Sequence, residues 1–123
     1  MDSLLLQDWV TIQGAANLGV TQGADFWLDV TDYEDLIFYL DVKSVTTTNI
    51  AGFFYETAPE LDDASFVAMV SGFVPTLGVQ TMAVLATYSA CPAARYVRWR
   101  IAGNTGGAWN ITFRLWIAAY SLR

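Results

Sequence analysis

The chain has 123 residues, of which 54% are hydrophobic, 15% aromatic and 15% charged, and its formal net charge is -6. This length suits one domain and is too short for two domains with separate cores. The apolar content excludes an intrinsically disordered chain. A folded monomer of this size exposes about 6,500 Å². So few charges on that surface leave apolar patches of the kind that form interfaces, and we therefore expect self-association.

Short segments rich in Val, Ile, Thr and aromatic residues predict β-strands along the whole chain, separated by turns with Gly, Pro, Asn, Asp or Ser. In the segment 36–43, period-2 alternation predicts a core face made of Leu36, Phe38, Leu40 and Val42. Asp62 or Asp63 could instead cap one helical turn near residue 65. The predicted strands are 9–13, 25–30, 36–43, 48–57, 65–70, 78–87, 95–101 and 109–117.

The last two predicted strands flank a glycine-rich turn at 103–107, which favours a β-hairpin. Pairing residue 101 with residue 109 places Trp99 opposite Ile111 and Val97 opposite Phe113 on the core side. The outer side of the predicted hairpin then carries Tyr96, Arg98, Arg100, Arg114 and Trp116.

About eight short strands with regular turn signals predict an all-β fold, a single antiparallel β-sandwich or jelly-roll-like domain over residues 1–123. The short segment 1–8 could form an extended arm. Residues 64–94 carry no charge and are numerous enough to span a bilayer, but glycine, proline and polar residues interrupt them. We therefore interpret this stretch as strands joined by turns and expect no membrane partner.

The charges are divided along the sequence. All twelve acidic residues lie at or before Asp63, whereas five of the six basic residues are arginines after it. Residues 1–63 therefore carry a net charge of -11 and residues 64–123 carry +5. Acidic and basic strands can neutralise each other within one monomer, or they can meet between subunits and set the register of an assembly. We expect no nucleic-acid partner, because a net acidic chain repels phosphate.

The outer arginines have three interpretations. They can pair with Asp29, Asp41 or Glu56 on a neighbouring strand, contact another protein, or hold a glycan or a nucleic acid through forked hydrogen bonds and stacking. The acidic groups can be solvated loops, a calcium site or a glycosidase-like pair. We favour solvated loops, because no EF-hand spacing is present. These groups are Asp25/Asp29, Asp32/Glu34/Asp35 and Glu56/Glu60/Asp62/Asp63.

The sequence gives little support to catalysis. It contains no histidine, no Gly-x-Ser-x-Gly motif and no phosphate-binding glycine loop, and Cys91 is its one cysteine. A lone cysteine without histidine makes neither an internal disulfide nor a Cys/His zinc site. The first residues also lack the basic start and long apolar run of a cleaved signal peptide. We expect no enzyme, no catalytic residue, no metal and no cofactor.

Three segments carry a resemblance to a known kind of protein. They are Leu36–Val42, the stretch Tyr55–Pro59 with Asp62–Asp63 and Ser65–Phe66, and Arg95–Arg100 with Phe113–Arg114. Together they resemble small β-sandwich virion proteins encoded in phage and prophage structural clusters. Such proteins decorate or cement capsids, or form tail and adaptor parts. The resemblance implies a repeated, symmetric assembly and brings no catalytic residue with it.

We therefore expect a structural virion subunit, most simply a phage capsid decoration or cement protein. Its partners would be further copies of itself and a major capsid or other virion protein, and it would be assembled in the host cytoplasm. The alternatives are a tail or adaptor component and a lectin-like ligand-binding module that uses Trp27, Tyr39, Trp109 or Trp116 for stacking. The interface candidates are Ile37, Tyr39, Tyr96, Arg98, Arg100, Arg114 and Trp116.

Overall fold

The computed structural model describes residues 1–87 and 89–121 and consists of strands joined by loops and single 3-10 turns. The strands are β1 (Asp2–Gly14), β2 (Val20–Thr21), β3 (Leu28–Asp29), β4 (Asp35–Val45), β5 (Ile50–Ala58), β6 (Val67–Ala68), β7 (Gly78–Val84), β8 (Tyr96–Gly103) and β9 (Trp109–Tyr120). The 3-10 turns are η1 (Ala24–Phe26), η2 (Thr47–Asn49) and η3 (Asp63–Ser65).

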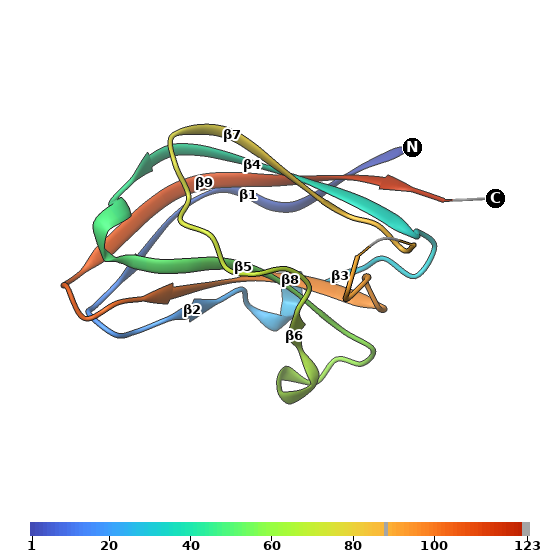
Figure 1. The fold of residues 1–123 in the computed structure, drawn as a ribbon, viewed down its shortest axis with the longest axis horizontal. Helices are drawn as coiled ribbons and strands as arrows, with labels where there is room; N and C mark the ends of the chain where they lie inside the picture. The colour runs from blue at the N-terminus through green and yellow to red at the C-terminus, as the bar shows by residue number, and fades with distance from the viewer. Residues whose placement is uncertain (88, 122–123) are drawn as a thin grey trace.

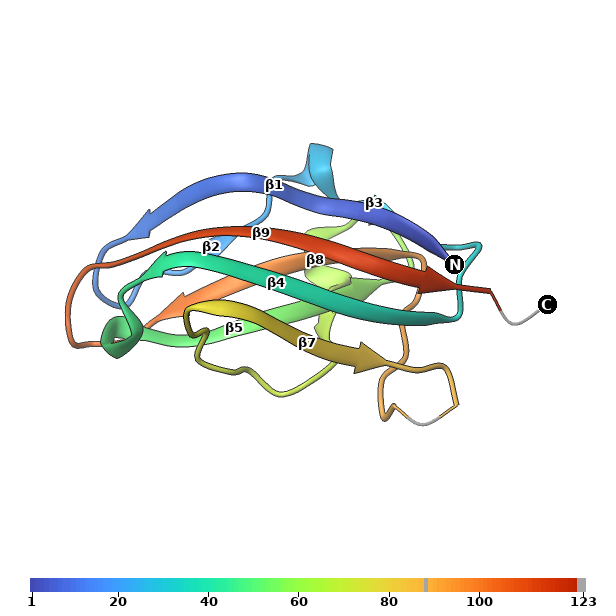
Figure 2. The same ribbon diagram turned by 90° about the horizontal axis from the view of Figure 1, so that it is seen from above.

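Two antiparallel sheets pack face to face, which confirms the predicted all-β sandwich (Figure 1). One sheet has the strand order β1-β9-β4-β7, which can be followed across the front of Figure 2. The other has the order β2-β8-β5-β6, and β3 pairs with β8 along the same edge as β2. The two short strands β2 and β3 therefore act as one interrupted edge strand.

The pairing of distant strands gives the jelly-roll topology. The first strand pairs with the last, β2 and β3 pair with β8, β4 pairs with β7, and β5 pairs with β6. A long hairpin whose two arms run side by side and then roll up produces this order, with successive pairs alternating between the two sheets. The predicted jelly-roll-like fold is confirmed.

The core lies between the two sheets. The predicted core face of β4 is buried, because Leu36, Phe38 and Leu40 have no exposed surface and Val42 is 3% exposed. Phe38 stacks on Tyr55 of the opposite sheet with the ring centroids 4.1 Å apart. The accessible surface of the molecule is 6410 Å², which matches the scaling expectation for a compact monomer.

The predicted hairpin of the last two long strands is wrong. β8 belongs to the sheet with β5, whereas β9 pairs with β1 and β4 in the other sheet. The turn at 103–107 therefore crosses between layers. Trp99 meets Phe113 across the core with the ring planes at 89° and the centroids 5.2 Å apart. The residues that point into the core were predicted correctly. They contact each other across the core from opposite sheets, because β8 and β9 are not neighbouring strands of one sheet.

Other segments differ from prediction in extent. Residues 2–8, which could have formed an arm, belong to β1 and pair with β9. The segment 25–30 divides into η1 and the two-residue β3, and 65–70 keeps only two strand residues after η3. The backbone N–H of Ala64 donates a hydrogen bond to the Asp62 carboxylate, so the proposed cap is confirmed.

Candidate interaction surface

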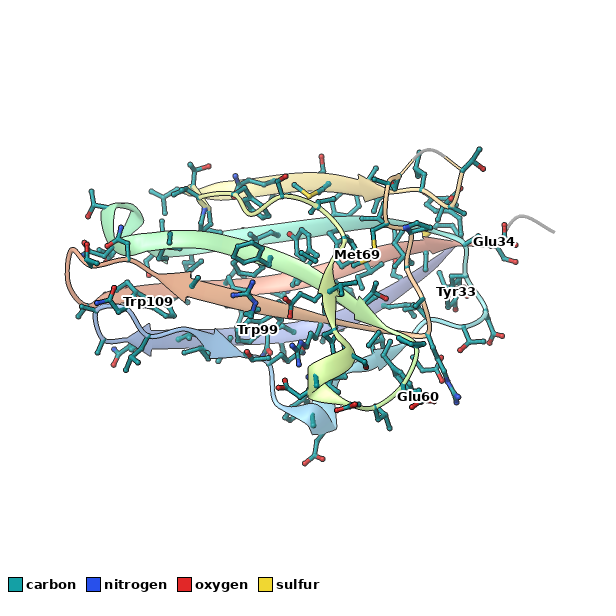
Figure 3. The ribbon with its side chains drawn as sticks, turned by 60° about the horizontal axis from the view of Figure 1, so that its bottom comes forward. Tyr33, Glu34, Glu60, Met69, Trp99 and Trp109 are labelled. Atoms are coloured by element: carbon teal, nitrogen blue, oxygen red, sulfur yellow. The ribbon has the colours of Figure 1, made fainter. Side chains whose placement is uncertain are left out.

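The placement of β8 and β9 in different sheets divides the predicted interface residues between opposite faces of the molecule. Tyr96, Arg98 and Arg100 of β8 point away from the core on the β2-β8-β5-β6 side, which comes forward in Figure 3. Four others lie on the outer face of the β1-β9-β4-β7 sheet, and they are Ile37, Tyr39, Arg114 and Trp116.

On the β8 side, a buried carboxylate joins two arginines. The Glu56 Oε1 and Oε2 atoms accept hydrogen bonds from Arg98 Nε and Arg100 Nε, both at 2.9 Å. Arg98 Nη1 also donates to Asp63 Oδ1 at 2.6 Å. The side chains of Glu56 and Arg98 are only 7% and 6% exposed. Paired and hydrogen-bonded charges are the form in which ions are tolerated at such depth.

Aromatic side chains from two loops enclose the Arg98 guanidinium. Its central carbon lies 3.9 Å from the Phe66 ring centroid and 5.0 Å from that of Trp27. These two rings contact each other edge to face at 4.6 Å. The cluster therefore fastens the loops that carry η1 and η3 to the sheet, and Arg98 has almost no surface left to offer another molecule.

Ion pairs within the chain engage the outer arginines, and Arg95 as well. Arg95 pairs with Asp29 at 3.3 Å, Arg98 and Arg100 pair with Glu56, and Arg114 lies 3.9 Å from Asp41. The predicted pairing with carboxylates on neighbouring strands is confirmed, and the acidic and basic halves meet within one chain. Hydrogen bonds from Thr31, with the Arg95 interaction in addition, lower the pKa of Asp29 below its ordinary value.

The outer face of the β1-β9-β4-β7 sheet is different in character, because it is mostly apolar and open. Its members come from all four strands, and several large ones are substantially exposed: Leu5 at 40%, Trp9 at 43%, Tyr39 at 39% and Val79 at 63%. Large apolar side chains gathered on one face are the usual mark of an interaction site. We give the name β9 face to the part of this outer surface around Tyr39 and Trp116, and the polar Thr11, Gln13, Asp35, Asn110 and Thr112 near the strand ends lie outside it. The β9 face consists of Ser3, Leu5, Trp9, Ile37, Tyr39, Asp41, Lys43, Val79, Thr81, Ala83, Arg114, Trp116 and Ala118.

Trp9 is a member that the sequence did not single out. Its ring lies under two cations, with Arg114 Cζ 4.8 Å and Lys43 Nζ 5.8 Å from the centroid. Arg114 also lies 5.8 Å from the Trp116 ring. These residues are far apart in the sequence, and a bulge in β1 shifts the register beside Trp9. Alternation within single strands therefore gave no signal for the cluster.

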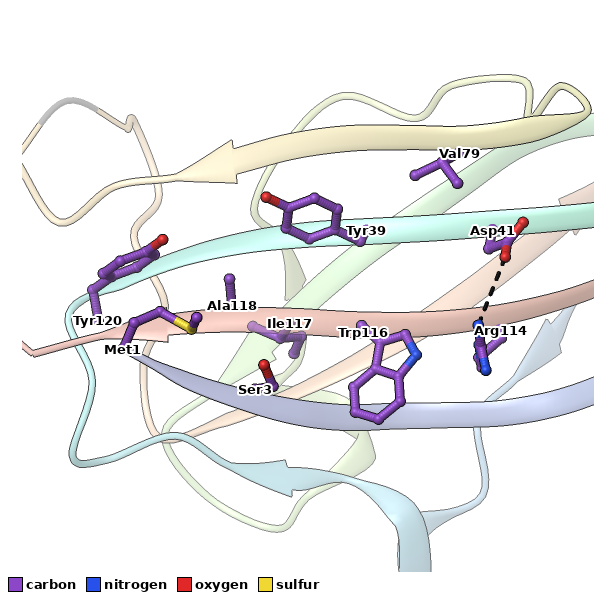
Figure 4. Close-up of a pocket in the computed structure, with 10 residues that line it drawn as sticks. All are labelled: Met1, Ser3, Tyr39, Asp41, Val79, Arg114, Trp116, Ile117, Ala118 and Tyr120. Atoms are coloured by element: carbon purple, nitrogen blue, oxygen red, sulfur yellow. Dashed lines mark ion pairs between the residues drawn. The ribbon is translucent and has the colours of Figure 1, made fainter.

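A shallow pocket of about 380 Å³ lies on the β9 face. Figure 4 shows Tyr39 and Asp41 on β4 beside Trp116 and Arg114 on β9, with Val79 on β7. Tyr39 and Trp116 are register partners, as are Asp41 and Arg114. The Arg114 Nε atom is buried and has no hydrogen-bond partner among the described residues. The pocket thus combines two aromatic side chains with a guanidinium whose side chain is partly exposed.

Two of the tryptophans proposed for ligand stacking are used inside the fold. Trp109 is 2% exposed and donates its Nε1–H to the Leu18 carbonyl at 3.1 Å. Trp27 donates to the Gln22 carbonyl at 2.8 Å and packs on Phe66. Only Tyr39 and Trp116 of that set share an open pocket. Cys91 is a half-buried free thiol.

Several of the acidic side chains are engaged in hydrogen bonds with nearby segments. Asp35 accepts a hydrogen bond from the Ala86 N–H at 2.8 Å, and Asp2 accepts one from the Tyr33 hydroxyl at 2.6 Å. Within residues 1–87 and 89–121, no three His, Cys, Asp or Glu side chains are grouped so that they could hold a metal ion. Across the same ranges, no helix is both long and apolar enough to cross a membrane.

No family model matches the sequence, and no curated protein matches it. Two solved structures of viral origin resemble the fold. One is infectious bursal disease virus, Gx strain, with a TM-score of 0.53 and 10% identity over 94% of this chain and 32% of that one. The other is the VP2 subviral particle of infectious bursal disease virus, with a TM-score of 0.50 and 12% identity over 94% of this chain and 31% of that one. This likeness shows a shared fold. The chain spans about a third of the length of these neighbours.

Proposed function

We propose that the protein is a non-enzymatic structural subunit of a virus particle, which associates with itself and with a major capsid or other virion protein. The observation that carries the proposal is the open, apolar β9 face on a jelly-roll sandwich. Jelly rolls are a common architecture of viral shells, and the two solved structures named above are of infectious bursal disease virus and of its VP2 subviral particle. An apolar sheet face gives such a subunit a surface for lateral contacts.

The distribution of charge also supports a structural role. The buried charged side chains are held in ion pairs. Glu56 bridges Arg98 and Arg100, and this cluster fastens two loops to the sheet. This arrangement favours a rigid scaffold.

The finer form of the proposal is a phage capsid decoration or cement protein, found in the virion and assembled in the host cytoplasm. It is supported by the sequence resemblance, with a tail or adaptor component as the alternative.

A second candidate function is favoured by one observation. Tyr39 and Trp116 lie side by side in the pocket on the β9 face, next to Asp41 and Arg114. Sugar rings bind to surfaces that combine aromatic stacking with charged hydrogen-bonding groups. In a lectin-like module, the Trp116→Ala variant would lose a glycan-array signal shown by the native protein.

The structural proposal is tested by light scattering after size exclusion, together with co-sedimentation with virus particles purified from cells that encode this protein. We expect oligomers at high concentration and a saturable number of copies on each particle. A protein that stays monomeric at high concentration and does not bind the particles would overturn the proposal. Charge reversal at Asp29, an exposed residue on the opposite sheet, serves as the control for nonspecific electrostatic adsorption.

A further inference from the structure

The β9 face has an order that can be followed strand by strand. In the row that contains the charged pair, Trp9, Arg114, Asp41 and Val79 follow one another across β1, β9, β4 and β7. The next row contains Leu5, Trp116, Tyr39 and Thr81, and the row after it contains Ser3, Ala118, Ile37 and Ala83. Each row therefore runs from β1 to β7 through a central β9–β4 pair.

A second copy rotated by 180° about an axis along the strands, between β4 and β9, presents each row in reverse. Face-to-face sheets pack about 10 Å apart with the strands nearly aligned, so rows meet rows. Tyr39 then lies over Trp116 of the second copy. The large Trp9 lies over the smaller Val79 of the second copy. The face is thus complementary to itself in size, as an isologous contact requires.

The charges are complementary under the same rotation. Asp41 of one copy lies over Arg114 of the other, and the contact occurs twice. Within one chain the Arg114 Nη2 atom lies 3.9 Å from Asp41 Oδ2, and the Arg114 side chain is still 34% exposed, so its guanidinium can donate to a second carboxylate. A like-charged arrangement at this place would oppose the contact, whereas this one favours a single register.

The net charge of the β9 face favours a second copy as its partner. Its charged members are Lys43, Arg114 and Asp41, which sum to +1, although the whole chain carries -6. Two copies can therefore approach through this face without the repulsion that their other surfaces would cause. With β4 eleven residues long and β7 seven, the footprint is about 600 Å² at ordinary strand spacing. That is close to the roughly 800 Å² per partner of a standard interface.

We propose that the β9 face is the site of a two-fold symmetric dimer of this chain, in which Asp41 of each copy pairs with Arg114 of the other and Tyr39 packs on Trp116. The inference rests on the proposed function, because it names the partner and the geometry of the self-association proposed there.

The test uses three preparations of the full chain: Asp41→Arg, Arg114→Asp, and an equal mixture of the two. In either variant alone, like charges meet across the two-fold axis, and we expect the dissociation constant to rise about a hundredfold. In a mixed dimer, the arginine introduced in one copy faces the aspartate introduced in the other, and the second contact is a native pair of Asp41 with Arg114. Heterodimers should therefore form. Sedimentation velocity measures the mass, and circular dichroism confirms that both variants fold.

Two further variants keep the result interpretable. Asp29→Arg makes the same charge change in an exposed ion pair on the opposite sheet and should leave dimerisation unchanged. Val79→Glu alters a 63% exposed residue that the fold does not need, and it should weaken the dimer by placing a carboxylate against Trp9 of the second copy.

Three results would overturn the inference. The first is unchanged association of Asp41→Arg, Arg114→Asp and Val79→Glu, which would place self-association on another surface and leave the proposed function standing. The second is a mixture that stays monomeric, since the two-fold register requires its rescue. The third is a monomeric native protein that binds virus particles and loses that binding on Asp41→Arg, which would assign the face to a different virion protein.

Discussion

Glu56 is the residue on which the β8 side of the molecule depends most. Its carboxylate is buried and accepts one hydrogen bond from each of two arginines. Removing it leaves Arg98 enclosed by aromatic rings, with the exposed Asp63 as its one remaining ion-pair partner among the described residues. Breaking a buried ion pair from one side is costly because the remaining charge cannot recover its hydration. The sequence predicted this pairing correctly, since Glu56 lies among acidic residues and the arginines alternate on a strand. It did not predict the depth of burial, which comes from loops folding over the pair.

We predict that Glu56→Gln lowers the free energy of unfolding by about 3–5 kcal/mol, measured by urea denaturation. Asp63→Asn is the matched control, because Asp63 contacts the same arginine but is 78% exposed. Its loss should be about 1 kcal/mol or less. Equal effects of the two substitutions would contradict the assignment of Glu56 as the central residue of this cluster.

At the scale of elements, β1 and β8 both approach the Trp109 ring closely at one end of the sandwich. This contact holds the two sheets together there. Trp109 begins β9, and its ring lies against Gly14 and Gly103 so closely that a Cβ at either glycine would overlap it. The ring is buried and hydrogen-bonded to the Leu18 carbonyl, so it cannot easily move aside. The sequence showed these glycines only as turn signals.

We therefore expect Gly14→Ala to destabilise the fold by about 1–3 kcal/mol through overpacking, as measured by thermal or urea unfolding. Gly23→Ala provides the control, because a Cβ there would meet only the Phe26 ring at an ordinary distance of 3.7 Å. A Gly14→Ala protein as stable as Gly23→Ala would show that Trp109 does not hold the position described.

The incorrect hairpin also belongs to this scale and has a physical explanation. A strand with one apolar face shows the same alternation whether its neighbour along the chain pairs beside it or packs opposite it across the core. The turn at 103–107 is long enough for both connections. Trp99 and Phe113 were therefore correctly predicted to lie inward. The sheet membership of their strands depended on pairing with distant segments, since β9 pairs with β1 and β4 whereas β8 pairs with β5.

At the scale of the whole molecule, the spacing of strands and turns in the sequence predicted the fold class. It did not predict which residues gather on the outer surface of each sheet. The excess of apolar residues noted in the sequence is mostly core. Among the described residues, four of the twelve large apolar side chains that remain exposed lie on the β9 face, and the others are spread over the chain ends, loops and short strands. Ile37, Tyr39 and Trp116 were predicted as interface candidates from alternation alone. Trp9 was not, because its neighbours Arg114 and Lys43 come from distant segments.

The central claim is that many copies of this jelly roll are built into a virus particle. It is tested most directly by electron cryomicroscopy of virus particles purified from cells that encode this protein. We predict symmetric density that fits the two-sheet sandwich, with its β9 face buried in a contact. Particles without such density, in a preparation from which the protein is absent by mass spectrometry, would contradict the claim.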